Sequence, residues 1–206
     1  MKTRAECLKE YGSDYFIEKK IEEGKLFKIE KGIYSEKRYV PDIAMLGYKY
    51  PNAVLTMKSA FYYYGLTDVI PDECDLATTR DAAKIKDKRV KQYFVPDLFF
   101  EEGIETADYK GYDIRIYNRE RMLIELIRYK TKLPFDYYKE IILNYRKLLP
   151  SLDIQKIQDY ALIAPKSNKV MEILQIYEKL GSLFGVIFAI VFAILAAFAV
   201  LLIIRQ

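Results

Sequence analysis

The chain has 206 residues, with 33 basic and 29 acidic side chains, two cysteines and no histidine. Without histidine it cannot build a Ser-His-Asp or Cys-His catalytic set, or a histidine-liganded zinc site. Cys7 and Cys74 match no metal-ligand or redox spacing, and we expect both to be buried and inert. The composition therefore predicts a protein that is not an enzyme, uses no metal or cofactor, and acts through its surfaces.

The N-terminal residues predict two short helices. Residues 3–11 can form the first, which Gly12 ends, and the side chain of Ser13 can cap the second. At about 100° per residue, Ile17 and Ile21 lie on one face of this second helix, which we expect to pack. The opposite face, which is free to touch a partner, carries Tyr15, Glu18, Lys19 and Glu22.

A tight hairpin is predicted after these helices. Leu26 to Ile29 alternate in polarity and face Ile33 and Tyr34 across a turn in which Gly32 supplies the positive φ. Helices followed by a two-stranded ribbon are typical of the winged helix, in which one helix enters the major groove of DNA and the wing reaches phosphates. The residues predicted to contact DNA are Ser13, Tyr15, Lys19 and Lys20 in the helix, and Lys28 and Lys31 in the wing.

An alternative for this unit is a helix and hairpin that only pack on the rest of the chain. Glu18 and Glu22 favour the alternative because they repel phosphates. Each could still accept a hydrogen bond from a cytosine edge. The residues alone leave both interpretations open.

The rest of the chain predicts a mixed α/β domain. Pro41 and Pro51 bracket DIAMLGYKY, which is neither strongly helical nor strongly strand-like, so we place the domain boundary there, between residues 1–48 and 49–178. A helix in NAVLTMKSAFYYYGL and strands in CDLATT, RVKQYFV and YDIRIYN come next, and four helical segments follow from Arg119. The predicted fold class is α/β (α+β): an N-terminal winged helix-turn-helix, then a mixed sheet ending in helices.

Two charged stretches allow more than one interpretation. Arg80 to Lys91 holds six basic and two acidic residues, which could attract nucleic acid or an acidic surface. We favour a solvated edge strand whose lysines discourage aggregation. Asp72, Glu73 and Asp75 could suggest metal ligands, but they lack partners at a recognisable spacing, and we expect them in turns.

Residues 183–204 form an uncharged apolar run of twenty-two residues, long enough to cross a bilayer core as a helix. More lysines precede the run than follow it, which predicts a cytoplasmic N-terminal side, and no secretory signal precedes it. We expect one C-terminal transmembrane helix within residues 181–206; a buried core helix or a tail not native to the domain are the alternatives. Small residues recur at every fourth position and could form a dimer face: Gly181, Gly185, Ala189, Ala193 and Ala197.

Several segments, taken in order, resemble the AbiEi-type antitoxins of bacterial abortive-infection (type IV toxin-antitoxin) systems. They are KLFKIEKGIYS, AVLTMKSAFYYYGLTDVIP, RVKQYFVPD, YDIRIYNRERMLIELIRYKTKLPFDYYKEIILNYRKL and KVMEILQ, across about residues 5–175. The resemblance implies an N-terminal winged helix that represses the operon's own promoter and a C-terminal domain that antagonises a nucleotidyltransferase-like toxin. Two features depart from the family: a leading helix is missing from the N-terminal unit, and a membrane tail is added.

The sequence and the resemblance together predict an antitoxin and transcriptional autorepressor held at the inner face of the membrane with its N-terminus inside. It would be cytoplasmic if the tail is not native. The expected partners are promoter DNA, the toxin, the lipid bilayer and a second copy of the chain. The alternative function is a tail-anchored membrane scaffold or interaction protein that does not bind DNA.

Overall fold

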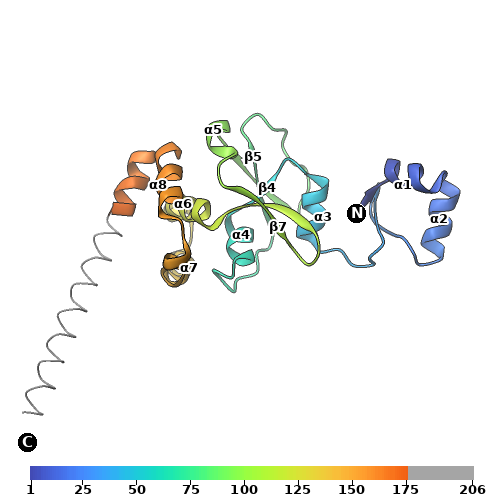
Figure 1. Cartoon of the computed structure of the whole chain (residues 1–206), viewed down its shortest axis with the longest axis horizontal. Coiled ribbons are helices and arrows are strands. Elements are labelled where there is room, and N and C mark those ends of the chain that lie inside the picture. The colour runs from blue at the N-terminus through green and yellow to red at the C-terminus, as the bar shows by residue number, and fades with distance from the viewer. Residues whose placement is uncertain (176–206) are drawn as a thin grey trace, which may run out of the picture.

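Three parts follow one another along an elongated molecule (Figure 1). The structure is a computed structural model that describes residues 1–175. A small N-terminal unit lies at one end, a sheet with its helices lies in the middle, and a group of helices lies toward the other end. The mixed α/β fold class predicted from the sequence is confirmed for these residues.

Two helices begin the N-terminal unit. Helix α1 (Arg4–Tyr11) starts at Thr3, whose hydroxyl accepts a hydrogen bond from the backbone N–H of Glu6, while the Glu6 carboxylate accepts one from the N–H of Thr3. This capping box fixes the first turn. Gly12, with a φ of 90°, ends the helix as predicted, and α2 (Asp14–Glu22) follows.

Ser13 stands at the N-cap position of α2, but its side chain makes no capping hydrogen bond, so the predicted side-chain cap is wrong. The start of α2 is held in another way. The guanidinium of Arg4 lies 2.5 Å from the carboxylate of Asp14 in the first turn, and Ile17 is buried one turn later. Contact between the two helices therefore takes the place of a local cap.

The predicted hairpin is confirmed. Strands β2 (Phe27–Glu30) and β3 (Ile33–Ser35) pair antiparallel across a turn in which Gly32 has a φ of 78°. Strand β1 (Lys2–Thr3), which was not predicted, pairs antiparallel with β3 and gives the order β1-β3-β2. The unit encloses a small core of its own, made of Cys7, Ile17, Leu26 and Tyr34.

Residues 42–50, which carry no clear pattern in the sequence, form a helix in the structure. Helix α3 (Asp42–Lys49) begins after Pro41 and buries Ala44, Met45 and Leu46 in the larger of the two cores. It contacts strands of the central sheet. Burial of one face therefore stabilises this helix, although Gly47 in its middle lowers its intrinsic propensity.

A five-stranded sheet forms the middle of the molecule. Its strands are β4 (Val54–Leu55), β5 (Cys74–Thr79), β6 (Val90–Val95), β7 (Ile104–Asp108) and β8 (Asp113–Tyr117). They lie in the order β6-β5-β4-β8-β7. The pairs β5/β6 and β4/β8 are parallel and the other two are antiparallel, so the predicted mixed sheet is confirmed. Strands β4 and β7 were not predicted.

Helices pack on the sheet and continue beyond it. They are α4 (Met57–Tyr63), α5 (Asp97–Phe100), α6 (Arg119–Tyr129), α7 (Phe135–Leu148) and α8 (Ile154–Ile163), with the 3-10 turns η1 (Lys130–Lys132) and η2 (Leu149–Ser151). Residues 167–175 are also helical. Helix α6 joins the two regions because it contacts both α4 and α8. The helical second half predicted from Arg119 onward is thus confirmed as far as residue 175.

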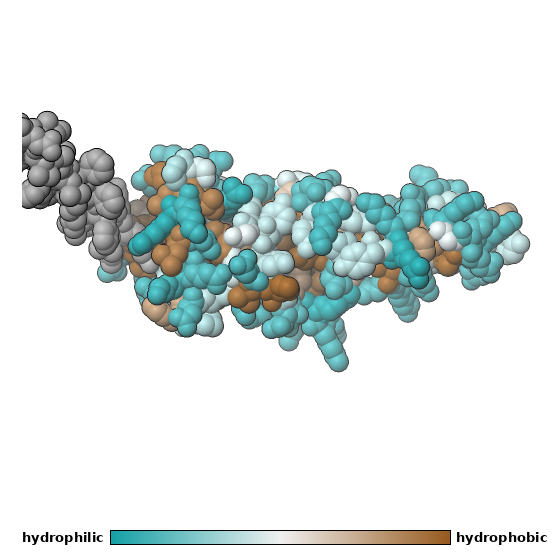
Figure 2. Space-filling model, turned by 90° about the horizontal axis from the view of Figure 1, so that it is seen from below, coloured by the Kyte–Doolittle hydropathy of each residue, from teal (hydrophilic) through white to brown (hydrophobic). Residues whose placement is uncertain are grey.

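Within residues 1–175, no helix is both long and apolar enough to cross a membrane. The predicted span, 183–204, lies outside the described residues, as do the five small residues of its predicted dimer face, Gly181, Gly185, Ala189, Ala193 and Ala197. In the view of Figure 2, hydrophilic residues cover most of the N-terminal end, while apolar patches gather over the helical end. Exposed Phe135 and Leu162 belong to that helical end.

Candidate nucleic-acid interface

The outer face of α2 is uncovered, as the helical wheel predicts. Tyr15 is 69% exposed and Phe16 is 49% exposed, and their rings meet edge to face with 5.4 Å between centroids. Lys19 is exposed one turn further along the same helix. A helix that shows two aromatic rings and a lysine to solvent can offer both apolar and cationic contacts to a partner.

Ion pairs divide the basic residues of the N-terminal unit into two groups. Lys2 is held by Glu10 and Glu36, and hydrogen bonds to these two carboxylates raise its pKa. Other cations are also paired: Arg4 with Asp14, and both Lys20 and Lys25 with Glu23. In the part of the chain that the structure describes, the unit's remaining lysines form no ion pair: Lys9, Lys19, Lys28, Lys31 and Lys37.

The residues predicted to contact DNA therefore differ in their exposure to solvent and in whether they form ion pairs. Lys19 in α2, and Lys28 and Lys31 in the hairpin, are exposed and unpaired within residues 1–175. Lys20 is half-buried and lies 3.4 Å from the Glu23 carboxylate. Ser13 is half-buried at the start of α2. The structure thus brings Tyr15 and the free lysines to the surface, and it leaves Lys20 and Ser13 less accessible.

The hairpin is tied to the central domain through a cluster of five charged side chains, in which the exposed Asp42 lies 3.5 Å from Arg89. Glu30, at the end of β2, lies 2.8 Å from Lys49 and 2.5 Å from Arg89. Asp87 lies 2.9 Å from Lys49 and 2.7 Å from Arg89. Hydrogen bonds from Arg89, then from Lys49, hold the pKa of Asp87 well below its usual range. The cluster neutralises Glu30 beside the wing turn, and no sequence pattern indicates it because its members are far apart along the chain.

Further contacts hold the N-terminal unit against the domain. The hydroxyl of Tyr48 in α3 donates to the carboxylate of Glu6, with 3.0 Å between the oxygens. Burial and this carboxylate raise the pKa of Tyr48 to about 12. The ammonium of Lys37 lies 4.9 Å from the ring centroid of Tyr112. These polar links fix where the wing lies relative to the sheet.

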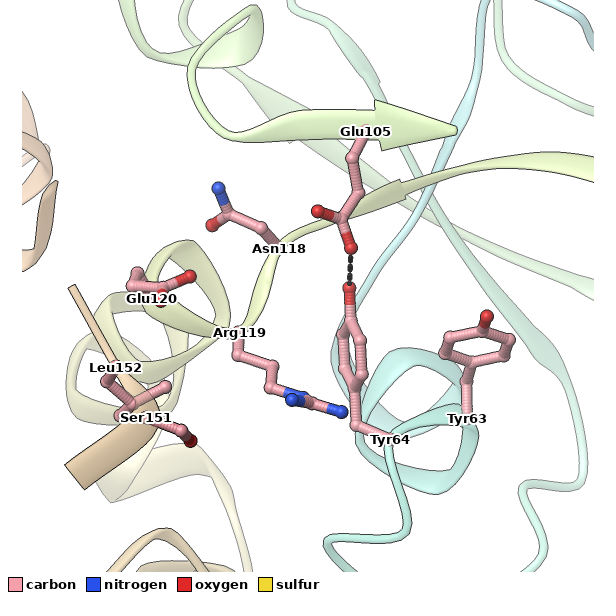
Figure 3. Close-up of a pocket in the computed structure, with 8 residues that line it drawn as sticks. All are labelled: Tyr63, Tyr64, Glu105, Asn118, Arg119, Glu120, Ser151 and Leu152. Carbon is pink, nitrogen blue, oxygen red and sulfur yellow. Dashed lines mark hydrogen bonds between the residues drawn. The ribbon is translucent and has the colours of Figure 1, made fainter. Parts of the chain in front are cut away.

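A polar pocket of about 460 Å³ lies where α6 begins, between the sheet and the helical end of the molecule (Figure 3). The hydroxyl of Tyr64 donates to Glu105 at 2.7 Å, and the guanidinium of Arg119 lies 5.2 Å from the Tyr64 ring centroid. Burial, and then Glu105, raise the pKa of Tyr64. The lining comes from four separate segments: Tyr63, Tyr64, Glu105, Asn118, Arg119, Glu120, Ser151 and Leu152.

This pocket holds its carboxylates in place. Glu105 accepts from Tyr64, and Glu120 accepts from the backbone N–H of Asp153 at 3.1 Å. The serine in this lining, Ser151, donates its hydroxyl to the carbonyl of Leu148 at 2.7 Å. Nothing in the sequence pointed to the pocket, since no short motif spans its four segments.

The acidic stretch near residue 75 also differs from the prediction. Asp75 is not in a turn: it lies in β5, is almost fully buried, and accepts a hydrogen bond from the N–H of Lys58 at 2.7 Å. It therefore caps the start of α4, and burial raises its pKa to about 6. Among residues 1–175, no cluster of three or more His, Cys, Asp or Glu is placed to hold a metal ion. Cys7 and Cys74 are free and buried, as expected.

No protein-family model matches this sequence, and no curated protein is significantly similar to it. The resemblance to AbiEi-type antitoxins therefore stays a prediction from the residues. A functional proposal must rest on the geometry of the N-terminal unit together with that resemblance.

Proposed function

We propose that the chain is an antitoxin and autorepressor that binds promoter DNA through its N-terminal unit. In this proposal the unit is a winged helix-turn-helix, α2 is the recognition helix, and the β2–β3 hairpin is the wing. One observation carries the proposal: two helices lead into a hairpin closed by a third strand, and the outer face of α2 and the wing lysines are left uncovered. This arrangement is how winged helices present a helix and a wing to DNA.

The charges of the unit suit a modest, specific contact more than a strong non-specific one. Residues 1–38 contain ten basic and eight acidic side chains, and several of these pair internally. Three of the free lysines lie on α2 and the wing, where Lys19 would face the groove and Lys28 and Lys31 would face phosphates. Glu18 and Glu22 are exposed on the same helix and reduce its attraction to phosphates, so the sequence-independent part of binding would be modest and base contacts would carry more of the selectivity.

A double change, Lys19→Ala with Lys31→Ala, tests this interface. We expect weaker binding to the promoter of its own gene in gel-shift titrations, and a dependence of log affinity on log salt that is shallower by about 0.9 for each phosphate that is no longer neutralised. Lys139→Ala with Lys156→Ala is the matched control, because both lysines are exposed at the opposite end of the molecule and remove the same charge. Equal binding by the test variant, the control and the wild type would refute the interface.

The antitoxin part of the proposal concerns residues 49–178 and rests on the resemblance. We expect co-expression of this chain to relieve growth arrest caused by a nucleotidyltransferase-like protein encoded beside it. The Lys19→Ala, Lys31→Ala variant should relieve it equally well, since neutralisation belongs to the other domain. If neither the wild type nor the variant changes growth, the antitoxin assignment fails.

Membrane tethering through residues 183–204 is a separate proposal, which rests on the apolar sequence. It also supports the competing function, a membrane-anchored interaction protein that does not bind DNA. Cell fractionation of the chain with and without residues 181–206, together with a reporter driven by the native promoter, separates the two. Repression that survives tail deletion favours the repressor; a chain that reaches the membrane and never represses favours the scaffold.

A further inference from the structure

The loop between β5 and β6 presents a row of lysines. From residue 84 to residue 89 exposed and half-buried side chains alternate, so that Lys84, Lys86 and Lys88 face solvent while Ile85 and Asp87 are partly covered. Within residues 1–175, none of the three lysines forms an ion pair. The expected edge strand begins only at Val90, and the lysine row precedes it. The row therefore presents three positive charges that no carboxylate of the described residues pairs.

Side-chain hydrogen bonds hold this loop in place. The N–H of Ile85 donates to the Gln92 side chain at 2.8 Å, and the amide of Gln92 donates to the carbonyl of Ala83 at 3.1 Å. Asp87 accepts from the backbone N–H of Arg89 at 3.1 Å. Lys84 and Lys86 lie in the irregular part of the loop, and Lys88 lies in a turn in which the N–H of Val90 donates to the carbonyl of Asp87 at 3.1 Å.

The lysine row lies next to the wing. Arg89 and Asp87, which alternate with the lysines, belong to the same charged cluster as Glu30. Glu30 immediately precedes Lys31 at the wing turn. Arg89 pairs with Glu30, Asp87 and Asp42, so each carboxylate of this cluster has a cationic partner. The charged cluster thus connects the segment that carries the wing lysines to the segment that carries the lysine row.

We propose that Lys84, Lys86 and Lys88 form a second phosphate-binding row, which continues the contact of the wing along the backbone of duplex DNA. This inference rests on the proposed function, since it extends the same DNA contact. Each strand of a duplex carries a phosphate about every 3.4 Å along the axis, so lysines that follow one another along a loop can reach neighbouring phosphates of one strand. An acidic protein would also be attracted, but the connection to the wing through the charged cluster places the row where bound DNA would continue.

The row would add affinity without adding sequence preference. Lysines on a loop carry no helix or ribbon into a groove, and phosphate contacts do not read bases. The row therefore predicts a contribution that is equal for promoter and scrambled duplexes, unlike the contribution of α2. This difference makes the inference separable from the proposed function.

The test is the triple variant Lys84→Ala, Lys86→Ala, Lys88→Ala in the full chain. The probes are a duplex of about 40 base pairs from its own promoter and a scrambled duplex of equal length, titrated by fluorescence anisotropy between 50 and 200 mM salt. The matched control is Lys139→Ala, Lys147→Ala, Lys156→Ala, which removes three exposed lysines from the helical end. Circular dichroism checks that both variants fold like the wild type.

If all three lysines contact phosphates, the salt dependence of the triple variant is shallower by about 2.7 in log–log slope. Its deficit in affinity at 50 mM salt then shrinks about 40-fold by 200 mM, equally for both duplexes, while the control follows the wild type. If the folded triple variant keeps the affinity and the salt dependence of the wild type, the three lysines do not bind phosphates, even where the promoter is still bound specifically. A wild type that binds neither duplex would overturn the proposed function as well.

Discussion

The buried ion pair of α6 predicts a large and asymmetric effect of mutation. Arg121 is 0% exposed, and its guanidinium lies 2.5 Å from the carboxylate of Glu125. The same guanidinium stacks on Phe99 with 3.3 Å to the ring centroid. Glu125 also pairs with Arg128, which is partly exposed and can turn to solvent. Removal of Glu125 would therefore leave one charge, that of Arg121, buried without its partner.

We expect Glu125→Ala to lower the free energy of unfolding by about 3 kcal/mol. Loss of one partner of a buried pair costs about 3–5 kcal/mol, and the remaining stacking on Phe99 places this case at the low end. With a urea m-value of about 2 kcal/mol/M, the midpoint falls by about 1.5 M. The double variant Arg121→Met, Glu125→Leu removes both charges and should unfold within about 1 kcal/mol of the wild type.

Urea unfolding followed by circular dichroism measures both variants. The decisive comparison is between the single and double variants, because both lose the ion pair and only the single variant keeps an unpaired buried charge. A Glu125→Ala midpoint that lies within error of the wild type would show that the unpaired Arg121 charge costs no stability. So would a double variant that is less stable than the single one.

Three other positions carry shorter predictions. Asp75→Asn should flatten the pH dependence of stability. The pKa of Asp75 is raised to about 6, so the folded state holds this proton more tightly than the unfolded state, and the wild type loses on the order of 2–3 kcal/mol as the pH rises from about 4 to about 6. An unchanged pH profile of thermal unfolding in the variant would contradict this. Gly103→Ala should cost more than about 2 kcal/mol, because φ is +76° and the new Cβ would lie 2.6 Å from the Cβ of Arg121. Gly24→Ala is its control and should cost about 1–2 kcal/mol, because φ is +69° but no atom lies within 4 Å; equal losses at the two glycines would show that the close approach to Arg121 is unimportant.

The sequence was sufficient to predict those elements whose structure depends on residues close together in the chain. Gly12 ends α1 and Gly32 forms the hairpin turn, because each takes a positive φ that glycine adopts freely. Strand β5 was found in full, since its β-branched and alternating residues match a strand. The exposed face of α2, with Tyr15 and Lys19, also followed from helical periodicity.

Elements that depend on distant contacts could not be read in this way. Helix α3 contains Gly47 and forms because Met45 and Leu46 are buried against the sheet. Strand β7, IETAD, has little apolar content and is held by its pairing with β8. The ion pair of Glu30 and Arg89 joins residues 59 positions apart, so no local sequence pattern could predict this contact between the wing and the domain.

DNA binding by the N-terminal unit at a defined site can be observed by DNase I footprinting of the chain's own promoter with the full chain at low salt. We expect a protected site that disappears for Tyr15→Ala with Lys19→Ala, because both side chains lie on the exposed face of α2, and that remains for the control Lys139→Ala with Lys156→Ala. Absence of protection by the folded wild-type chain, or protection unaffected by the α2 changes, would show that α2 does not bind this DNA.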